Sequence, residues 1–226
     1  MRRRCALLAL LVLLPACTSA RGLDRDALAA VVAPPAGPAG VAPLARPFKL
    51  GIFLHPPAQP AATPAAAPRL WEWEPSDEQK LLRIGESLKR DRIVSDVVLV
   101  GRDTAAAQDL ASIRRAAARE GADAVLVVSG VVDVDRYNNW LGPSYVLLLT
   151  PLLIPGTVVD ALFVSHAGLW GVRDELLYSS VEADGAATQT RPAWMVSEQR
   201  VVALAKERSV SDLAAATLDS IERLAE

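Results

Sequence analysis

Residues 120–130 read Glu-Gly-Ala-Asp-Ala-Val-Leu-Val-Val-Ser-Gly, and their pattern indicates an α/β fold. The glycine at position 121 ends a helical pattern, because glycine readily takes the backbone conformation found just beyond a helix. Residues 124–129 then continue without a charge, which is typical of a strand buried on both faces. A helix that leads directly into such a strand is the repeating unit of α/β folds.

Two strands and two helices are predicted upstream of this join. The strands cover residues 48–54 and 94–100, which are short and mostly apolar. A helix over about 75–90 separates them, since a proline and acidic residues stand at its start and apolar residues recur at helical spacing. A second helix is predicted to begin at a cap formed by Asp103 or Thr104. The order β-α-β-α-β predicts largely parallel strands with right-handed crossovers.

The pattern changes downstream of the join. Residues 158–169 and 172–182 read as two long strands that meet near Gly171, which predicts an antiparallel hairpin. Helical sequence follows from about Met195, and Ser211-Asp212 reads as the start of a last helical segment. The sequence therefore predicts an α/β fold with a mixed sheet of about five strands, helices packed on it and a C-terminal helix.

The first seventeen residues carry a targeting signal. Three arginines at positions 2–4 precede ten apolar residues over 5–14, whereas a transmembrane helix needs about 20. This length is normal for a secretory signal. Leu14-Pro15-Ala16-Cys17 resembles a bacterial lipobox, which implies that residues 1–16 are a lipoprotein signal peptide and that Cys17 is lipidated. A plain signal peptide with a chance cysteine, or an uncleaved buried helix, are the alternatives.

The residue after Cys17 bears on localisation. It is Thr18 rather than an aspartate, and by resemblance to Gram-negative lipoproteins this implies sorting to the outer membrane with a periplasm-facing domain. Acyl chains such as palmitate contribute about 0.8 kcal/mol per buried methylene, so that two or more chains anchor a protein stably. Cys5 would leave with the signal, and Cys17 would then be the only cysteine of the mature chain.

Residues 17–47 are predicted to form a lipidated cysteine and a tether. They contain five prolines, at positions 34, 35, 38, 43 and 47, among alanines and small residues. Such a composition favours extended segments over a compact coil, and Leu23–Val32 is the one stretch where helical periodicity could indicate a helix. The remaining residues, 48–226, are predicted to form a single periplasmic α/β domain with an apolar insertion at about 137–160.

Composition excludes several classes of function. The 226 residues hold 24 Lys and Arg against 26 Asp and Glu, without a dense basic run beyond the first four residues, so we expect no nucleic-acid partner. Two cysteines and two histidines cannot supply a tetrahedral zinc site with ligands to spare. Glycine-rich phosphate-binding motifs are missing from the sequence, and we expect no cofactor.

Catalytic residues are not evident either. Ser165 and His166 are neighbours on a predicted strand, so that their side chains point to opposite faces and cannot form a catalytic pair. Asp133 and Asp135 share a face and could bind a divalent cation, but EF-hand spacing does not follow, and we expect solvated carboxylates and no metal. The sequence predicts a protein that is not an enzyme.

The most unusual segment is residues 145–159, which contain no charge. Its prolines and glycine would break a membrane-spanning helix, and it is too short for one. The segment could pack on the domain or on a partner, lie on a membrane surface, or supply strands to a pore. The predicted interaction surface consists of Trp140, Tyr145, Leu148, Leu152, Ile154 and Val158.

The lipobox, the tether, the strand Lys-Leu-Gly-Ile-Phe-Leu at 49–54 and the join at 120–130 together resemble a group of bacterial envelope lipoproteins. Over about residues 48–183 the chain is similar to rhombotarget-type lipoproteins, to the amino-terminal domain of TolB and to the periplasmic domain of the curli-secretion lipoprotein. The resemblance implies a non-enzymatic binding or assembly module of the envelope, with an envelope protein or a second copy as partner. An oligomeric secretion-channel component that inserts residues 140–160 into the membrane is the alternative.

Overall fold

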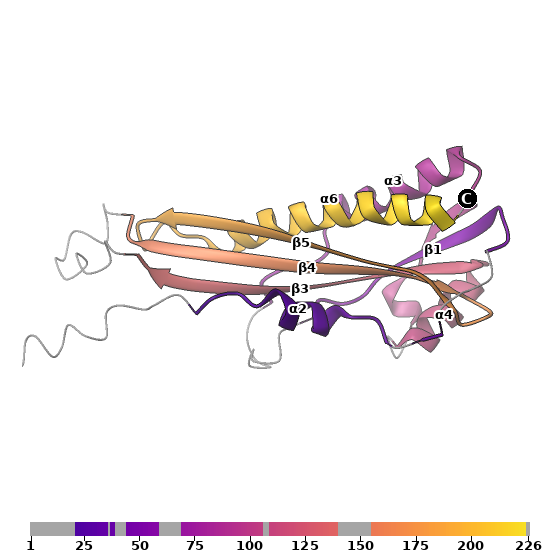
Figure 1. Cartoon of the computed structure of the whole chain (residues 1–226), viewed down its shortest axis with the longest axis horizontal. Helices are drawn as coiled ribbons and strands as arrows, with labels where there is room; N and C mark the ends of the chain where they lie inside the picture. The colour runs from indigo at the N-terminus through magenta and orange to yellow at the C-terminus, as the bar shows by residue number, and fades with distance from the viewer. Residues whose placement is uncertain are drawn as a thin grey trace, which may run out of the picture.

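A five-stranded mixed sheet with helices on both faces forms the protein (Figure 1). The structure, a computed structural model, describes residues 21–35, 37–38, 44–58, 69–105, 109–139 and 155–224. The strand order across the sheet is β2-β1-β3-β4-β5. The strands are β1 (Phe48–Leu54), β2 (Val94–Leu99), β3 (Ala124–Asn138), β4 (Thr157–Gly171) and β5 (Leu177–Arg191). The helices are α2 (Arg25–Val32), α3 (Pro75–Arg90), α4 (Leu110–Arg119) and α6 (Glu198–Leu224), with a short 3-10 turn, η2, at Arg102–Thr104.

The parallel part of the sheet confirms the predicted β-α-β-α-β order. β1 lies between β2 and β3 and is parallel to both. Helix α3 covers the predicted residues, because Pro75 stands in its first turn and Glu74 and Asp77 form a reciprocal capping box. Helix α4 begins later than predicted, since Asp109 caps it by accepting a 2.7 Å hydrogen bond from the Ser112 N–H. The predicted cap at 103–104 is wrong, because these residues form η2.

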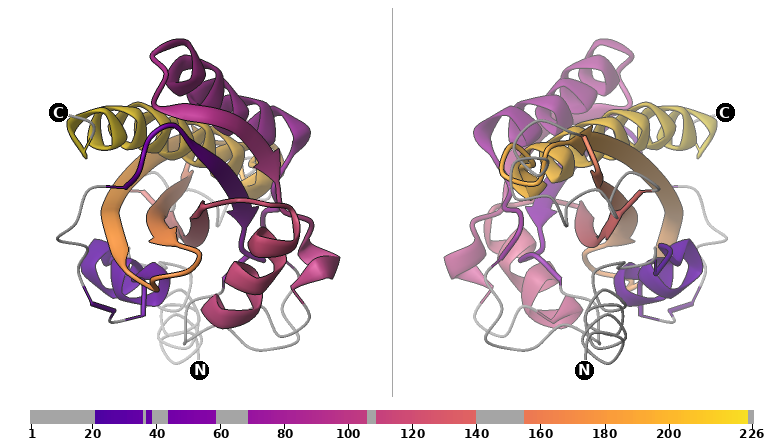
Figure 2. Two further views of the ribbon diagram at one scale, coloured as in Figure 1. Left: turned by 90° about the vertical axis from the view of Figure 1, so that its right-hand side faces the viewer. Right: turned by 90° about the vertical axis from the view of Figure 1, so that its left-hand side faces the viewer.

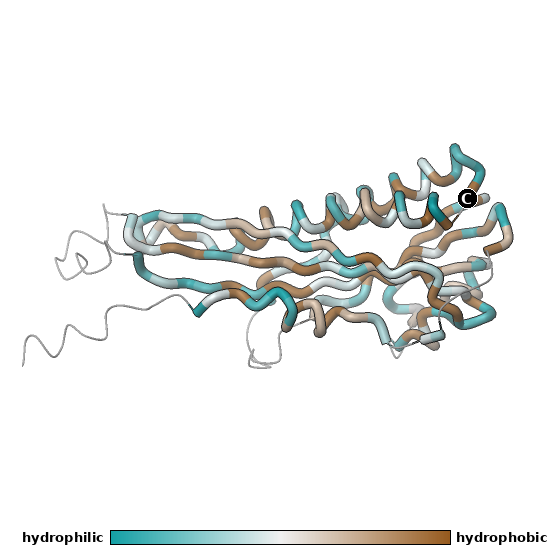
Figure 3. Tube along the Cα trace, in the orientation of Figure 1, coloured by the Kyte–Doolittle hydropathy of each residue, from teal (hydrophilic) through white to brown (hydrophobic). Residues whose placement is uncertain are grey.

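The antiparallel part is a long three-stranded ribbon. β3, β4 and β5 each have fifteen residues, and β4 pairs with both neighbours along almost its whole length. The hairpin between β4 and β5 confirms the prediction, although its turn lies after Gly171 and β5 continues to Arg191. β4 is largely hydrophobic and buried along most of its length, whereas β5, at the edge of the sheet, carries many hydrophilic residues (Figure 3).

The C-terminal helix is a single element. Helix α6 has 27 residues and runs straight through Ser211-Asp212, so the prediction of a separate last segment is wrong. The Ser211 hydroxyl donates a 2.8 Å hydrogen bond to the Glu207 carbonyl one turn earlier, which lets a residue typical of helix starts lie within the helix. Figure 2 shows α6 and α3 lying side by side over one face of the sheet.

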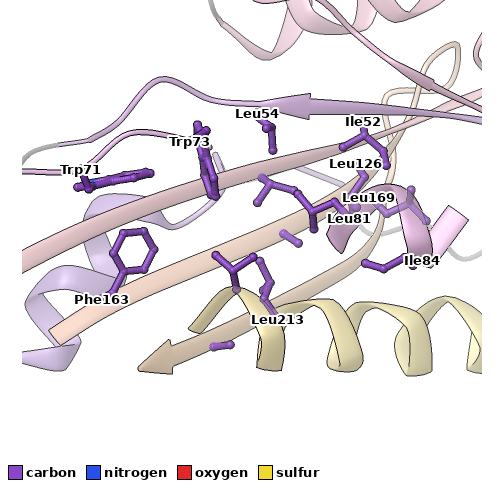
Figure 4. Close-up of a cluster of buried hydrophobic side chains, with 14 of the residues drawn as sticks. Ile52, Leu54, Trp71, Trp73, Leu81, Ile84, Leu126, Phe163, Leu169 and Leu213 are labelled. Atoms are coloured by element: carbon purple, nitrogen blue, oxygen red, sulfur yellow. The ribbon is translucent and has the colours of Figure 1, made fainter. Parts of the chain in front are cut away.

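The main hydrophobic core lies between that face and these two helices. Phe163 of β4, Leu213 of α6 and Leu81 of α3 are fully buried in it (Figure 4). Trp71 packs edge-on against Phe163 with 4.7 Å between the ring centroids, and it closes the core between α3 and the ribbon.

Two of the predicted segment boundaries change in the structure. Residues 25–32, within the predicted tether, form helix α2 and pack on the sheet. Residues 157–160, within the predicted apolar insertion, belong to β4, while residues 124–138 form one strand up to the start of that insertion. Residues 140–154 lie outside the described residues.

Candidate functional site

The segment at 21–35 crosses the face of the ribbon opposite α6 (Figure 1). Asp24 starts helix α2 by accepting a 3.0 Å hydrogen bond from the Ala27 N–H. Leu28 and Val32 of this helix are buried in a small apolar cluster with Val164 of β4. Ser165, the next residue, points to α6 instead, so that the two helices cover opposite faces of the same strand.

The first residues of this segment are bound to two carboxylates of β3. We call these four residues the N-terminal clamp: Arg21, Gly22, Asp133 and Asp135. The backbone N–H groups of Arg21 and Gly22 both donate to Asp135 Oδ2, at 2.6 and 2.7 Å. The Arg21 guanidinium donates to Asp133 Oδ1 at 2.8 Å, and this hydrogen bond together with its charge raises the pKa of Arg21. Asp135 is only 6% exposed. The expectation of a solvated carboxylate is therefore wrong for Asp135, whereas the Asp133 side chain stays 20% exposed beside Arg21.

A second pair of contacts ties the same segment to β5. The Arg25 guanidinium lies 2.7 Å from Glu182 Oε1 and 2.8 Å from Asp184 Oδ1. Its hydrogen bond to Asp184 and the two carboxylate charges raise the pKa of Arg25. Since the clamp holds β3 and Arg25 holds β5, the segment spans the width of the ribbon across β4.

A cavity of about 540 Å³ lies next to the end of α2. It is bounded by residues 31–35, by the start of α4 and by the sheet, and its walls are mainly apolar. Both histidines of the chain line it. Its other lining side chains include Leu110, Ile113, Val127 and Trp170.

The histidine on β4 is held neutral by its surroundings. His166 is 5% exposed, and burial lowers its pKa to about 4. Its Nε2 lies 2.8 Å from Ser180 Oγ. Ser165 lies on the other face, where its Oγ is 2.6 Å from Ser209 Oγ, which confirms that Ser165 and His166 do not meet. The cavity can therefore offer an uncharged imidazole and apolar walls at neutral pH.

The end of the ribbon nearest the clamp is a second feature of interest. Asn138, Thr157 and Arg191 stand opposite one another where β3 ends, β4 begins and β5 ends. We call this group, with the turn at 192–197, the ribbon end. In that turn Trp194 is 64% exposed and Met195 is 44% exposed.

The predicted interaction surface is only partly within the structure. Val158 is 7% exposed and pairs with Tyr137 and Thr190 inside the ribbon. Its side chain is therefore buried in the domain and offers little surface to a partner. The other five residues, Trp140, Tyr145, Leu148, Leu152 and Ile154, lie outside the described residues. Cys17 lies outside them too, and its lipidation stays a prediction.

Sequence reasoning missed both Arg21 and the exposed pair at 194–195. Arg21 makes its contacts with residues more than a hundred positions away, and nothing in its local sequence indicates them. Trp194-Met195 follows Pro192 at the end of a polar strand. A large apolar pair in such a turn could have indicated an exposed contact surface. None of the helices in the described part of the chain is long and apolar enough to span a bilayer. The described residues also contain no group of three His, Cys, Asp or Glu side chains that could hold a metal.

Comparison with known proteins finds similarity at the level of solved structures. No family model matches the chain, and no curated protein sequence matches it. The PelC dodecamer from Paraburkholderia phytofirmans is 19% identical, with 82% of this chain and 91% of that chain covered and a TM-score of 0.32. Lipoprotein GNA1162 from Neisseria meningitidis is 11% identical, with coverages of 77% and 99% and a TM-score of 0.32. The LpoB C-terminal domain from Salmonella enterica is 12% identical, with coverages of 62% and 84% and a TM-score of 0.31.

Proposed function

We propose that this protein is a lipoprotein of the bacterial outer membrane whose periplasmic domain is a non-enzymatic binding or assembly module. The observation that carries the proposal is the short distance in sequence between the lipobox cysteine and the packed domain. Cys17 precedes Arg21 by four residues, and Arg21 is already fixed to β3. A lipid on Cys17 would therefore hold the domain at the membrane surface rather than at the end of a long tether.

The chemistry of the described polar residues supports a binding role over catalysis. Several polar side chains that an enzyme could use are paired with other side chains of the protein, and of these only His166 lines the cavity beside α2. These pairs are Ser165 with Ser209, His166 with Ser180, Asp77 with Lys206, and Asp133 and Asp135 with Arg21.

The experiment is expression of the full-length chain in a diderm host, beside a Cys17→Ser variant. We expect the parent in the outer-membrane fraction with a diacylated or triacylated N-terminal peptide by mass spectrometry. The Cys17→Ser variant should lack the lipid and leave the outer-membrane fraction. A parent whose mature N-terminus carries no lipid would contradict the proposed anchoring.

The module role is tested separately on the soluble chain that begins at residue 18. Crosslinking in periplasmic extract, followed by light scattering of the purified chain, should give a defined complex with a second copy or with one envelope protein. A chain that stays monomeric and forms no defined complex would contradict this part of the proposal. Turnover of a substrate by the same chain would contradict its non-enzymatic character.

A further inference from the structure

The N-terminal clamp lies close to one end of the ribbon and far from the other. Asp135 pairs with Asp160, and Asp160 pairs with Thr188, which is three residues before Arg191 at the ribbon end. At about 3.3 Å per residue this separation is about 10 Å. Along β4 the opposite end, at Gly171, is eleven residues from Asp160, or about 36 Å.

The chain between Cys17 and Arg21 is too short to reach the far end. Four residues span at most about 14 Å even when fully extended. This length reaches the ribbon end but covers less than half of the distance to Gly171. Because the backbone N–H groups of Arg21 and Gly22 and the Arg21 guanidinium are all bound to β3, a lipid on Cys17 would enter the bilayer beside the ribbon end.

The ribbon end carries the side chains that such a position requires. Trp194 is the most exposed large apolar side chain of the described residues, and Met195 next to it is also exposed. Tryptophan favours the membrane–water interface, where its ring meets both apolar and polar surroundings. Arg191, exposed at the same level, adds a positive charge that is attracted to anionic headgroups.

We propose that the turn at 192–197 docks on the lipid headgroup region of the membrane in which Cys17 is anchored. The ribbon then stands away from the bilayer, and the turn between β4 and β5, at 172–176, points into the periplasm. The proposal rests on the proposed lipidation of Cys17 and adds the orientation of the domain and a second contact with lipid.

The test places one label at each end of the ribbon in the lipidated protein. Since lipidated Cys17 has no free thiol, Met195→Cys and Glu175→Cys each provide a single site for a fluorescent dye. The proteins are reconstituted in vesicles of phosphatidylethanolamine and phosphatidylglycerol that contain a headgroup-linked nitroxide quencher. We expect strong loss of fluorescence at position 195 and almost none at position 175.

A second variant tests whether the clamp sets this orientation. Asp135→Ala removes the acceptor of both backbone N–H groups, so the loss of fluorescence at position 195 should shrink. Asp160→Ala is the matched control, because Asp160 lies beside Asp135 but accepts hydrogen bonds from Tyr137 and Thr188 instead of Arg21. This control should keep the quenching of the parent. If Asp135→Ala does not fold, Arg21→Ala, which removes the guanidinium contacts, takes its place.

The outcomes separate this proposal from the proposed function. A lipidated, membrane-bound protein with equal quenching at both positions, or stronger quenching at 175, would overturn the docking of the ribbon end while leaving the anchor intact. A protein without lipid at Cys17 would overturn both. Trp194→Ala with intact lipid should reduce quenching at position 195, and an unchanged value would assign the contact to the lipid alone.

Discussion

The two faces of the ribbon are covered in very different ways. On one face the 27-residue helix α6 packs over a continuous core that includes Phe163 and Leu213. On the other face the eight-residue helix α2 buries two side chains and lies beside a cavity of about 540 Å³, and Arg21 and Arg25 add ion pairs that are partly exposed. We infer that most of the stability comes from the α6 face, whereas the α2 face holds the segment that follows the predicted lipidation site at Cys17.

The largest effect is expected from breaking a buried ion pair on the α6 side. Lys206 of α6 is 4% exposed and lies 2.7 Å from Asp77 of α3, which is 2% exposed. Lys206→Met leaves this carboxylate buried without a cation and should lower the free energy of unfolding by about 3–5 kcal/mol. Urea denaturation of the soluble chain measures it.

The matched control is Lys80→Met, since Lys80 lies 4.0 Å from an exposed carboxylate of Glu207. Its cost should stay below about 1 kcal/mol. Equal stability of the Lys206→Met variant and its parent would show that α6 and α3 do not depend on the pair.

On the α2 face we expect the largest change in stability from the protonation of His166 as the pH falls. Its folded pKa, about 4, lies below the ordinary value of 6.5, so the unfolded chain binds the proton more readily between these values. The contribution of neutral His166 to the free energy of unfolding is therefore fully present above about pH 6.5. It is lost as the pH falls towards 4, and the loss reaches about 3 kcal/mol below that pH. Urea midpoints of the parent and of His166→Gln across this range measure the difference. An equal slope in both proteins would assign the acid sensitivity to other groups.

Substituting alanine for one glycine on each face tests how closely each face is packed. A Cβ at Gly185 would lie 2.3 Å from the Ala205 carbonyl oxygen of α6 and 2.6 Å from the Ser209 nitrogen. A Cβ at Gly168, beside the cavity, would meet only side-chain atoms, the nearest being Trp170 Nε1 at 2.9 Å. Gly185→Ala should cost about 2–3 kcal/mol because α6 must move as a unit, and Gly168→Ala should cost less. Thermal unfolding of the two variants gives the order, and a reversed order would contradict the account of a rigid α6 face.

The smallest effect is expected from the α2 helix itself. Leu28 is 3% exposed and packs in the small cluster on this face. Leu28→Ala should lower the free energy of unfolding by about 2 kcal/mol, the low end of the range for leucine truncation. The loss is small because a short helix next to a cavity can shift to fill part of the space left by the side chain. Val31→Ala is the control, since Val31 in the same helix is 39% exposed. Equal losses in the two variants would indicate that α2 is not docked.

Much of the fold could be predicted because the sequence patterns that define its helices and strands are local. The proline and acidic residues at the start of α3, and the uncharged run at 124–129, define their elements without reference to the rest of the chain. The second half of β3 was missed for the opposite reason. Asp133, Asp135 and Arg136 interrupt its apolar pattern, and their partners, Arg21 and Glu198, come from distant parts of the sequence.

The site was harder to predict for the same physical reason. Charges on a sheet face are ordinarily solvated, and only the folded chain brings Arg21 onto them. Proline content between residues 17 and 47 indicated a tether, but eight residues with a capping aspartate and two buried apolar side chains are enough for a docked helix when a sheet face is available.

The most direct test of the account concerns the amides of Arg21 and Gly22. Both donate to Asp135, which is buried, so their hydrogen exchange should be as slow as that of the flanking α2 helix in the soluble chain. Asp135→Ala should make both amides exchange rapidly, and Asp160→Ala should leave them protected. Rapid exchange of both amides in the parent, while β4 stays protected, would contradict a segment that is fixed to the ribbon from its first residues.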